Sequence, residues 1–202
     1  MTASVSPTYT GRADDLRFGP TVDIEPGTLD VLFSKTAAAR PDDPAVVGDG
    51  GPLTYAELDR RATAVARYLR ERGVGTGDRV AVLANRCGWM SAVVSGIIRA
   101  GAVYVPVDAS YPAERVAFIF GDCEPAAVFA LGGASLPADL ADSLAKSGIV
   151  TATITDDSPL GRAIIDGSAD PAWATAGPFS QAEQSRPVIG EDPCYIIYTS
   201  GT

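Results

Sequence analysis

The sequence predicts an α/β fold built on a largely parallel sheet with helices on both faces. Short, continuous apolar runs recur along the chain, at RVAVLA (79–84), VYVPV (103–107) and AAVFAL (126–131), and such runs are typical of strands that are covered on both faces. Segments with helical periodicity separate these runs, and strands that alternate with helices favour a parallel sheet. The chain has 202 residues, of which 46% are hydrophobic, so it can bury a core of this kind.

The N-terminal region is expected to consist of a flexible arm followed by a helix. Residues 1–27 contain several turn-forming residues and no periodic apolar face, which is typical of a loose terminus. Leu29, Leu32 and Phe33 then recur at helical spacing, and a proline follows this run. The rest of the chain, residues 28–202, is interpreted as one domain.

A small hairpin and a capped helix are predicted next. AVV (45–47) and LTY (53–55) flank a glycine-rich turn, which favours two short strands. Thr54 and Glu57 have the T-x-x-E spacing of a capping box, so a helix is expected to begin here. Gly73 follows the last periodic residue and is expected to end that helix.

The remaining elements follow the same alternation. Strands are predicted at 79–84, 103–107, 126–131, 149–154 and 194–198, and helices at 90–100, 112–120 and 136–146. The strand at 103–107 is expected in the centre of the sheet, with Pro106 at its end or at a bulge because proline has no N–H to donate. Residues 155–190 carry little periodicity and are expected to form a long surface excursion.

Two patterns that could suggest a binding site have simpler interpretations. The glycine-rich stretch GVGTGD (73–78) follows a helix and precedes a strand, the reverse of the dinucleotide-binding order, so it is interpreted as a helix end and a tight turn. A run of arginines lies on the predicted helix that begins near residue 55, and Glu57 can pair with Arg61 at i, i+4. A solvated helix face is therefore expected for Arg60, Arg61, Arg67, Arg70 and Arg72.

Composition excludes several classes of function. The net charge is −9 and the pI about 4.4, which argues against binding to nucleic acid or to an anionic membrane surface. Histidine is absent, so Ser-His-Asp and Cys-His catalysis and histidine-bearing metal sites are excluded. The three cysteines have no CxxC spacing and are interpreted as reduced thiols. No signal peptide or long apolar stretch is present, and a cytoplasmic location is expected.

The last residues, YTSGT (198–202), form the strongest candidate site. A hydrophobic run ends in two hydroxyl residues, a glycine and a further hydroxyl residue. Glycine allows close approach of the backbone to a ligand, and successive N–H groups with hydroxyls can hold a phosphate. The composition of this stretch is compatible with a phosphate-binding loop and with an ordinary turn.

Four stretches, in their order along the chain, resemble the opening motifs of the adenylate-forming enzymes. They are LTYAELDRRA (53–62), GVGTGDRVAVL (73–83), RAGAVYVPVDASYPAERVAFIF (99–120) and DPCYIIYTSGT (192–202). The likeness is greatest to the adenylation domains of nonribosomal peptide synthetases. The motif YVPVD followed by YPAER resembles the motifs of amino-acid-activating domains more than those of fatty acyl-CoA synthetases.

The resemblance implies an ATP-dependent reaction in two halves. A carboxylate, here an amino acid, attacks the α-phosphate of ATP to give an acyl-adenylate and pyrophosphate, and a phosphopantetheine thiol on a peptidyl carrier protein then takes the acyl group. Mg²⁺ is implied as well. Thr199, Ser200, Gly201 and Thr202 look like the first half of the family's phosphate-binding loop. No catalytic or metal-binding residue and no cation at the loop is assigned.

The resemblance also implies that most of the active site lies outside these residues, so the chain alone is expected to be inactive. Two other functions remain open: an adenylation-like interaction module that completes or regulates another chain, and an acyl- or aryl-CoA ligase of the same superfamily. Apolar side chains at Tyr195–Tyr198 are expected to stay partly exposed, which favours self-association.

Overall fold

The computed structural model describes residues 27–48, 51–166 and 179–199, and its centre is a four-stranded sheet. All neighbouring strands of this sheet are parallel, in the order β4-β3-β5-β6. The strands are β3 (Arg79–Ala84), β4 (Val103–Asp108), β5 (Ala127–Leu131) and β6 (Val150–Ile154). The predicted α/β class and four of the five strands predicted for the sheet are thus confirmed, whereas all but Gly27 of the arm expected at 1–27 lies outside the described residues.

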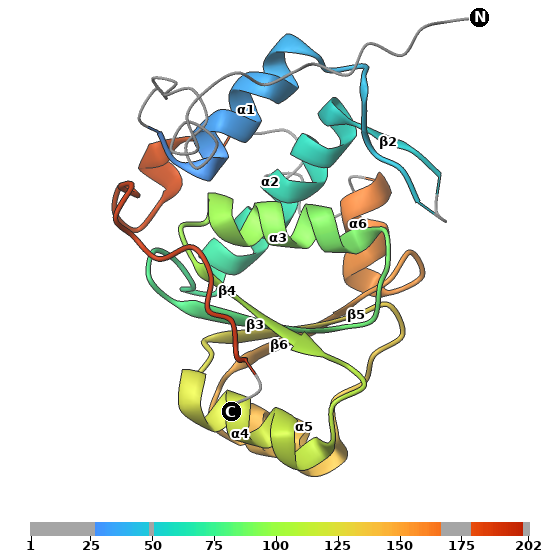
Figure 1. The fold of residues 1–202 in the computed structure, drawn as a ribbon, viewed down its shortest axis with the longest axis vertical. Coiled ribbons are helices and arrows are strands. Elements are labelled where there is room, and N and C mark those ends of the chain that lie inside the picture. Colours follow the sequence, from blue (N-terminus) through green and yellow to red (C-terminus); the bar gives the residue numbers. More distant parts are fainter. Residues whose placement is uncertain (1–26, 49–50, 167–178, 200–202) are drawn as a thin grey trace, which may run out of the picture.

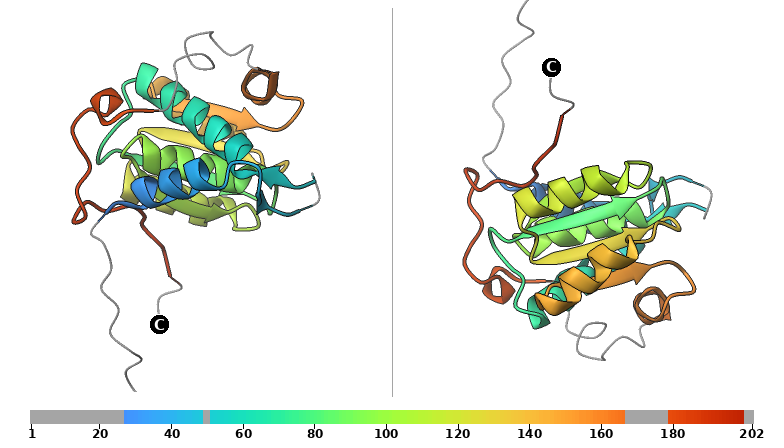
Figure 2. Two further views of the ribbon diagram at one scale, coloured as in Figure 1. Left: turned by 90° about the horizontal axis from the view of Figure 1, so that it is seen from above. Right: turned by 90° about the horizontal axis from the view of Figure 1, so that it is seen from below.

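Helices cover both faces of the sheet (Figure 1). One face carries α2 (Tyr55–Glu71), α3 (Trp89–Arg99) and α6 (Pro159–Asp166), and α1 (Leu29–Ala39) packs outside α2 and α3. The opposite face carries α4 (Ala113–Cys123) and α5 (Ala138–Lys146), which are seen in front of the sheet in the second view of Figure 2. This arrangement is the doubly covered sheet that the apolar runs predicted.

Each strand contributes side chains to two separate cores. In β3, Val80 and Val82 pack toward α2 and α3, whereas Ala81 and Leu83 pack toward α4. All four of these side chains are at most 2% exposed. Successive side chains of a strand point to opposite faces, so a strand buried on both faces needs apolar residues at every position. This explains why the strands appear as continuous apolar runs.

Local signals place the ends of α2 as predicted. The Glu57 N–H donates to Thr54 Oγ1 and the Thr54 N–H donates to Glu57 Oε2, each over 3.2 Å, which forms the predicted capping box. A short antiparallel hairpin of β1 (Pro44–Val46) and β2 (Leu53–Thr54) precedes the helix. Beyond it, Gly73 adopts a φ of +78°, the left-handed conformation that glycine reaches without strain.

The strand predicted at 103–107 lies at the edge of the described sheet, so its expected central position was wrong. The run predicted as a strand at 194–198 is also not a regular strand, because its only ladder contact among the described residues is an isolated parallel bridge between Tyr104 and Tyr195. Tyr104 N–H donates to Cys194 O, and Ile196 N–H donates to Tyr104 O, each over 2.9 Å.

Proline explains why this pairing stops. Residues two apart on a strand point their backbone groups to the same side, so Pro106 faces the 194–199 segment as Tyr104 does. Proline has no N–H, and therefore cannot donate the next bond of the ladder. Pro106 was expected at the strand's end or at a bulge, but it occupies an interior position of β4 on the side away from β3.

The expected surface excursion at 155–190 contains a helix that contributes to the core. In α6, Ile164 is 1% exposed and belongs to the cluster beneath α2 and α3. Its neighbours Leu160 and Ala163 are partly buried against the same cluster. The spacing 160, 163, 164 is helical, but the helix has only 8 residues and the sequence around it is rich in turn-formers, so the local pattern does not predict it.

The prediction that the arginines of α2 form a solvated helix face was also wrong. Arg67 is 6% exposed, and its Nε lies 3.0 Å from Glu183 Oε1. Arg70 donates to the Glu183 carbonyl and Arg60 to the Ile164 carbonyl. Segments distant in sequence therefore cover this face of the helix and use its guanidinium groups as hydrogen-bond donors.

Arg61 does not form the predicted ion pair with Glu57 in the described part of the chain. Its guanidinium carbon lies 5.0 Å from the ring centroid of Trp89 instead.

None of the helices in the described ranges combines the length and the apolar character needed to span a bilayer.

Candidate functional site

The candidate site lies where the 194–199 segment leaves the sheet and runs along α4. Ile196 and Tyr198 are partly buried against the cluster beneath α4. Tyr195 and Ile197 point the other way and are 58% and 60% exposed. Alternate residues of the segment are thus anchored and exposed, and the segment delivers Thr199 to the side of α4.

Thr199 is the one predicted phosphate contact in the described part of the chain. It is exposed, and its carbonyl accepts a hydrogen bond of 3.3 Å from Arg115 Nη2. Ser200, Gly201 and Thr202 lie outside the described residues. Their role as phosphate contacts therefore remains a prediction.

Arg115 supplies a cation that sequence reasoning missed. It lies in the first turn of α4, and its guanidinium carbon lies 5.5 Å from the Phe118 ring centroid. Arginine has five N–H donors, and only the bond to Thr199 involves a described residue. The signal was present in YPAER, but 84 residues separate Arg115 from Thr199, and no local spacing connects them.

Tyr198 fixes the approach to Thr199. Its hydroxyl donates a hydrogen bond of 2.5 Å to Asp122 Oδ2, near the C-terminal end of α4. Burial, together with this bond, raises the pKa of Tyr198 to about 12. The phenol therefore remains neutral and keeps donating throughout the physiological pH range.

The carboxylate of Asp108 stabilises the loop between β4 and α4. Asp108 Oδ1 accepts a hydrogen bond of 2.8 Å from the Ser110 N–H. Bonds from Ser110 keep the pKa of Asp108 below its ordinary value, so this carboxyl group is ionised at neutral pH. The bond sets the direction in which the chain enters the helix that carries Arg115.

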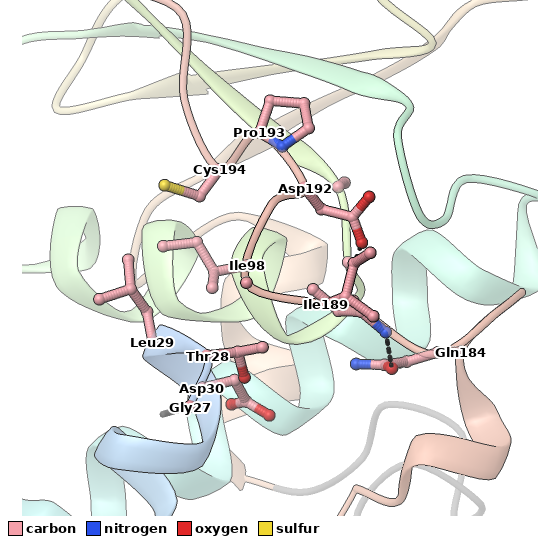
Figure 3. Close-up of a pocket in the computed structure, with 14 residues that line it drawn as sticks. Gly27, Thr28, Leu29, Asp30, Ile98, Gln184, Ile189, Asp192, Pro193 and Cys194 are labelled. Carbon is pink, nitrogen blue, oxygen red and sulfur yellow. Dashed lines mark hydrogen bonds between the residues drawn. The ribbon is translucent and has the colours of Figure 1, made fainter. Parts of the chain in front are cut away.

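A separate small cavity lies near the beginning of β4, between the start of α1 and the 184–194 segment (Figure 3). Its volume is about 120 Å³, and its walls include Leu29, Ile98 and Ile189. The Asp30 carboxylate at this cavity is bound to Arg99 Nε over 2.8 Å. An apolar lining with a neutralised carboxylate offers no cation to a phosphate, so this cavity does not belong to the predicted phosphate site.

Metal ligands do not gather in the described part of the chain. Residues 27–48, 51–166 and 179–199 contain no group of three or more histidine, cysteine, aspartate or glutamate side chains that could hold a metal ion. The cysteines are free thiols, and burial raises the pKa of Cys123 to about 11.

Comparison with known proteins identifies the family. The family model described as "AMP-binding enzyme" matches residues 33–202. The chain belongs to this family. Its members form adenylates from ATP, and the matched range includes β3, β4, α4 and the TSGT stretch, so the resemblance seen in the sequence is confirmed.

The relatives of this family member include a biosynthesis protein and a synthase subunit from two bacteria. Novobiocin biosynthesis protein H of Streptomyces niveus is 33% identical over 183 residues, which cover 91% of this chain and 28% of that protein. Surfactin synthase subunit 1 of Bacillus subtilis is 34% identical over 179 residues, which cover 87% of this chain and 4% of that protein. The chain thus spans less than a third of the length of these relatives.

Solved structures of the family share the fold. The AMPPNP-bound form of the nonribosomal peptide synthetase FmoA3 is 30% identical with a TM-score of 0.67, and the match covers 92% of this chain and 18% of that one. A Rhodopseudomonas palustris protein assigned as a long-chain-fatty-acid CoA ligase is 31% identical with a TM-score of 0.67, and the match covers 87% and 42%. Both nonribosomal peptide synthetases and a CoA ligase are therefore among the structural neighbours.

Proposed function

We propose that this chain forms the N-terminal part of an adenylation domain that activates an amino acid with ATP. The observation that carries the proposal is the contact between Arg115 and Thr199, which puts a cation beside the first residue of the TSGT stretch. The similarity to the nonribosomal peptide synthetase FmoA3, which is also solved in a form bound to α-methyl-L-serine-AMP, supports an amino acid as the carboxylate.

In the proposed reaction, a carboxylate oxygen of the amino acid attacks the α-phosphorus of ATP. The bond between this phosphorus and the oxygen that bridges it to the β-phosphate breaks, and pyrophosphate leaves with both electrons of that bond. A phosphopantetheine thiol on a peptidyl carrier protein then attacks the acyl carbon, and AMP leaves. Mg²⁺ would neutralise phosphate charge in the first step.

The residues of this chain have a binding role in this proposal. The guanidinium of Arg115 would offset negative charge on the phosphates, and the Thr199 hydroxyl and the backbone N–H groups of residues 200–202 would donate to phosphate oxygens. Tyr198 and Asp122 would hold the segment in place. A cation and a hydroxyl side by side form a donor set that suits a phosphate.

The test is a titration of the 202-residue chain with AMPPNP, followed by amide and arginine side-chain NMR. We expect weak, saturable shifts at residues 199–202 and at Arg115, and an affinity at least about tenfold weaker for Arg115→Gln, because a charged hydrogen bond contributes about 1.5–3 kcal/mol. Arg40→Gln is the matched control, since Arg40 forms an exposed pair with Asp43. Shifts that avoid residues 199–202, or an unchanged affinity for Arg115→Gln, would contradict the proposal.

Catalysis is a separate part of the proposal. Because the relatives are much longer, we expect the chain alone to give no amino-acid-dependent exchange of pyrophosphate into ATP. Exchange above a blank without protein would show that the parts of the relatives beyond the matched region are not needed for adenylate formation.

A CoA ligase is the second candidate, favoured by the similarity to the Rhodopseudomonas palustris protein. The two differ in the acceptor thiol, which belongs to a carrier protein in one and to free coenzyme A in the other. Association through the exposed Tyr195 and Ile197 also remains a prediction, and sedimentation at several concentrations of chain tests it.

A further inference from the structure

A second cavity, of about 460 Å³, opens at the carboxyl ends of β3, β5 and β6. Its lining includes residues Arg86–Trp89 after β3, Gly132 after β5, and Thr155 and Asp156 after β6. Neither Arg115 nor Thr199 lines it. The cavity is therefore distinct from the proposed phosphate site.

The topology of the sheet accounts for this opening. The chain leaves β3 toward α3 on one face of the sheet, whereas it leaves neighbouring β5 toward α5 on the opposite face. Connections that diverge in this way leave a crevice between adjacent strands, and parallel sheets characteristically bind ligands there. A hydrogen bond of 3.0 Å from Asn85 Nδ2 to the Gly132 carbonyl joins the loops that follow β3 and β5.

Arg61 brings to this cavity a guanidinium group with an unsatisfied donor. Its Nε is enclosed and has no hydrogen-bond partner among the described residues, and its guanidinium lies over the Trp89 ring at 5.0 Å. Burial, and secondarily Arg60, lower the pKa of Arg61. An enclosed donor without an acceptor destabilises the fold, and an anion in the cavity would relieve that cost.

Two further groups add positive potential. Arg86 lines the cavity, and its side chain has no ion-pair partner in the described part of the chain. The N-terminus of α3 also faces this region, where Gly88 is the N-cap, no side chain caps the helix, and no acidic residue lies in its first turn. Free N–H groups at a helix N-terminus favour a negative charge.

Two carboxylates oppose these charges, Glu57 and Asp156, and both raise the pKa of Arg61. Asp156 lines the cavity and raises the pKa of Arg61, but its Oδ1 already accepts a hydrogen bond of 2.8 Å from Trp89 Nε1. Among the residues that line the cavity, two guanidinium groups thus face one carboxylate. The remaining walls are largely apolar, formed by Val46, Leu53, Ile154 and Ile165.

We propose that this cavity binds a small organic carboxylate with an apolar body, whose carboxylate pairs with Arg61 between the Trp89 ring and the N-terminus of α3. The apolar walls favour such a ligand over inorganic phosphate, which could use the cations but would leave those walls in contact with water. The site goes beyond the proposed ATP reaction, because none of its residues belongs to the phosphate site.

The experiment uses the 202-residue chain and benzoate as the probe. The chain has two tryptophans, Trp89 and Trp173, so the Trp173→Phe variant leaves Trp89 as the sole tryptophan reporter. We expect saturable quenching of its fluorescence by benzoate, with a shift of the Trp89 indole N–H signal in NMR. Benzamide, which has the same shape without the charge, should bind at least about tenfold more weakly.

Variants in the same background decide which groups bind. Arg61→Gln should weaken benzoate binding about tenfold or more, and Arg86→Gln, which changes an exposed side chain and is expected to fold, should weaken it severalfold. Arg162→Gln is the control, because Arg162 lies on α6 in an exposed pair with Asp157 and does not line the cavity.

Three results would overturn the proposal: no saturable change with benzoate up to its solubility limit, equal affinities for benzoate and benzamide, or equal affinities for the Arg61→Gln and Arg162→Gln variants. Inorganic phosphate forms a further arm of the experiment. If phosphate binds as tightly as benzoate and displaces it, the assignment to a carboxylate with an apolar body is wrong.

Discussion

Tyr104 and Tyr195 form an isolated parallel bridge that attaches the 194–199 segment to the edge of the sheet. Two residues further along β4 is Pro106, which has no N–H to continue the ladder. The segment that carries Thr199 is therefore held to the sheet only at its beginning. Beyond the bridge it is held by side chains, through the contacts of Tyr198 with Asp122 and of Arg115 with Thr199.

The first prediction restores the missing donor. In Pro106→Ala, the new N–H at residue 106 should donate to Ile196 O, and the ladder should extend toward Tyr198. We expect about fivefold slower exchange of the Tyr198 amide hydrogen, which corresponds to one hydrogen bond of about 1 kcal/mol. Hydrogen exchange followed by NMR measures this rate. An unchanged rate would show that something other than the proline ends the pairing.

The second prediction concerns the dependence of stability on pH. The folded-state pKa of Tyr198 is raised to about 12, above the ordinary value of about 10. A raised pKa contributes stability that is complete below pH 10 and is lost as the pH rises from 10 toward 12, because the unfolded chain ionises first. The wild-type chain should therefore lose more stability over this window than Tyr198→Phe, as measured by denaturant unfolding at each pH.

Tyr195→Phe is the control for this pH effect, because the Tyr195 side chain is 58% exposed. It should follow the wild-type pH dependence. If Tyr198→Phe follows it as well, the hydrogen bond to Asp122 does not persist in solution.

The third prediction compares two glycines in helix interiors. A Cβ at Gly96 in α3 would lie 2.6 Å from Val65 Cβ on α2, whereas a Cβ at Gly121 in α4 would meet nothing within 4 Å. Gly96→Ala should destabilise the chain by about 1–3 kcal/mol, because the two helices must separate. Gly121→Ala should instead stabilise it by about 0.5–1 kcal/mol through helix propensity. Thermal or urea unfolding of both variants tests the contrast, and equal effects would contradict the close packing of α2 and α3.

The fourth prediction concerns the guanidinium of Arg99, which is 2% exposed. Its Nε lies 2.8 Å from Asp30 Oδ1 and its Nη2 lies 2.7 Å from Asp59 Oδ1. Arg99→Met leaves these carboxylates without their partner and should cost about 3–5 kcal/mol in the free energy of unfolding. Arg162→Gln, which breaks an exposed pair, should cost at most about 1 kcal/mol. A loss of less than 1 kcal/mol for Arg99→Met would mean that the carboxylates find other partners.

Much of the local structure was predictable because its causes lie within a few residues of chain. The apolar run at 79–84 coincides with β3, and the capping box of Thr54 and Glu57 places the start of α2. Both signals depend on alternation or on i, i+3 spacing, which the sequence shows directly. The resemblance of residues 99–120 and 192–202 to adenylate-forming enzymes was also visible in the sequence, because each motif is a contiguous stretch.

The order of the strands and the contacts between distant segments were decided only by the tertiary structure. Neither the edge position of β4 nor the covering of Arg67 by Glu183, 116 residues away, leaves a local trace. The same holds for Arg115 beside Thr199 and for Arg61 Nε, which lies at the carboxyl edge of the sheet without a hydrogen-bond partner among the described residues. Such contacts form only when long loops of chain close around a common core, and many pairings are compatible with the same local pattern. The sequence by itself determined the elements and the family, whereas the packed fold decided which side chains those elements bring together.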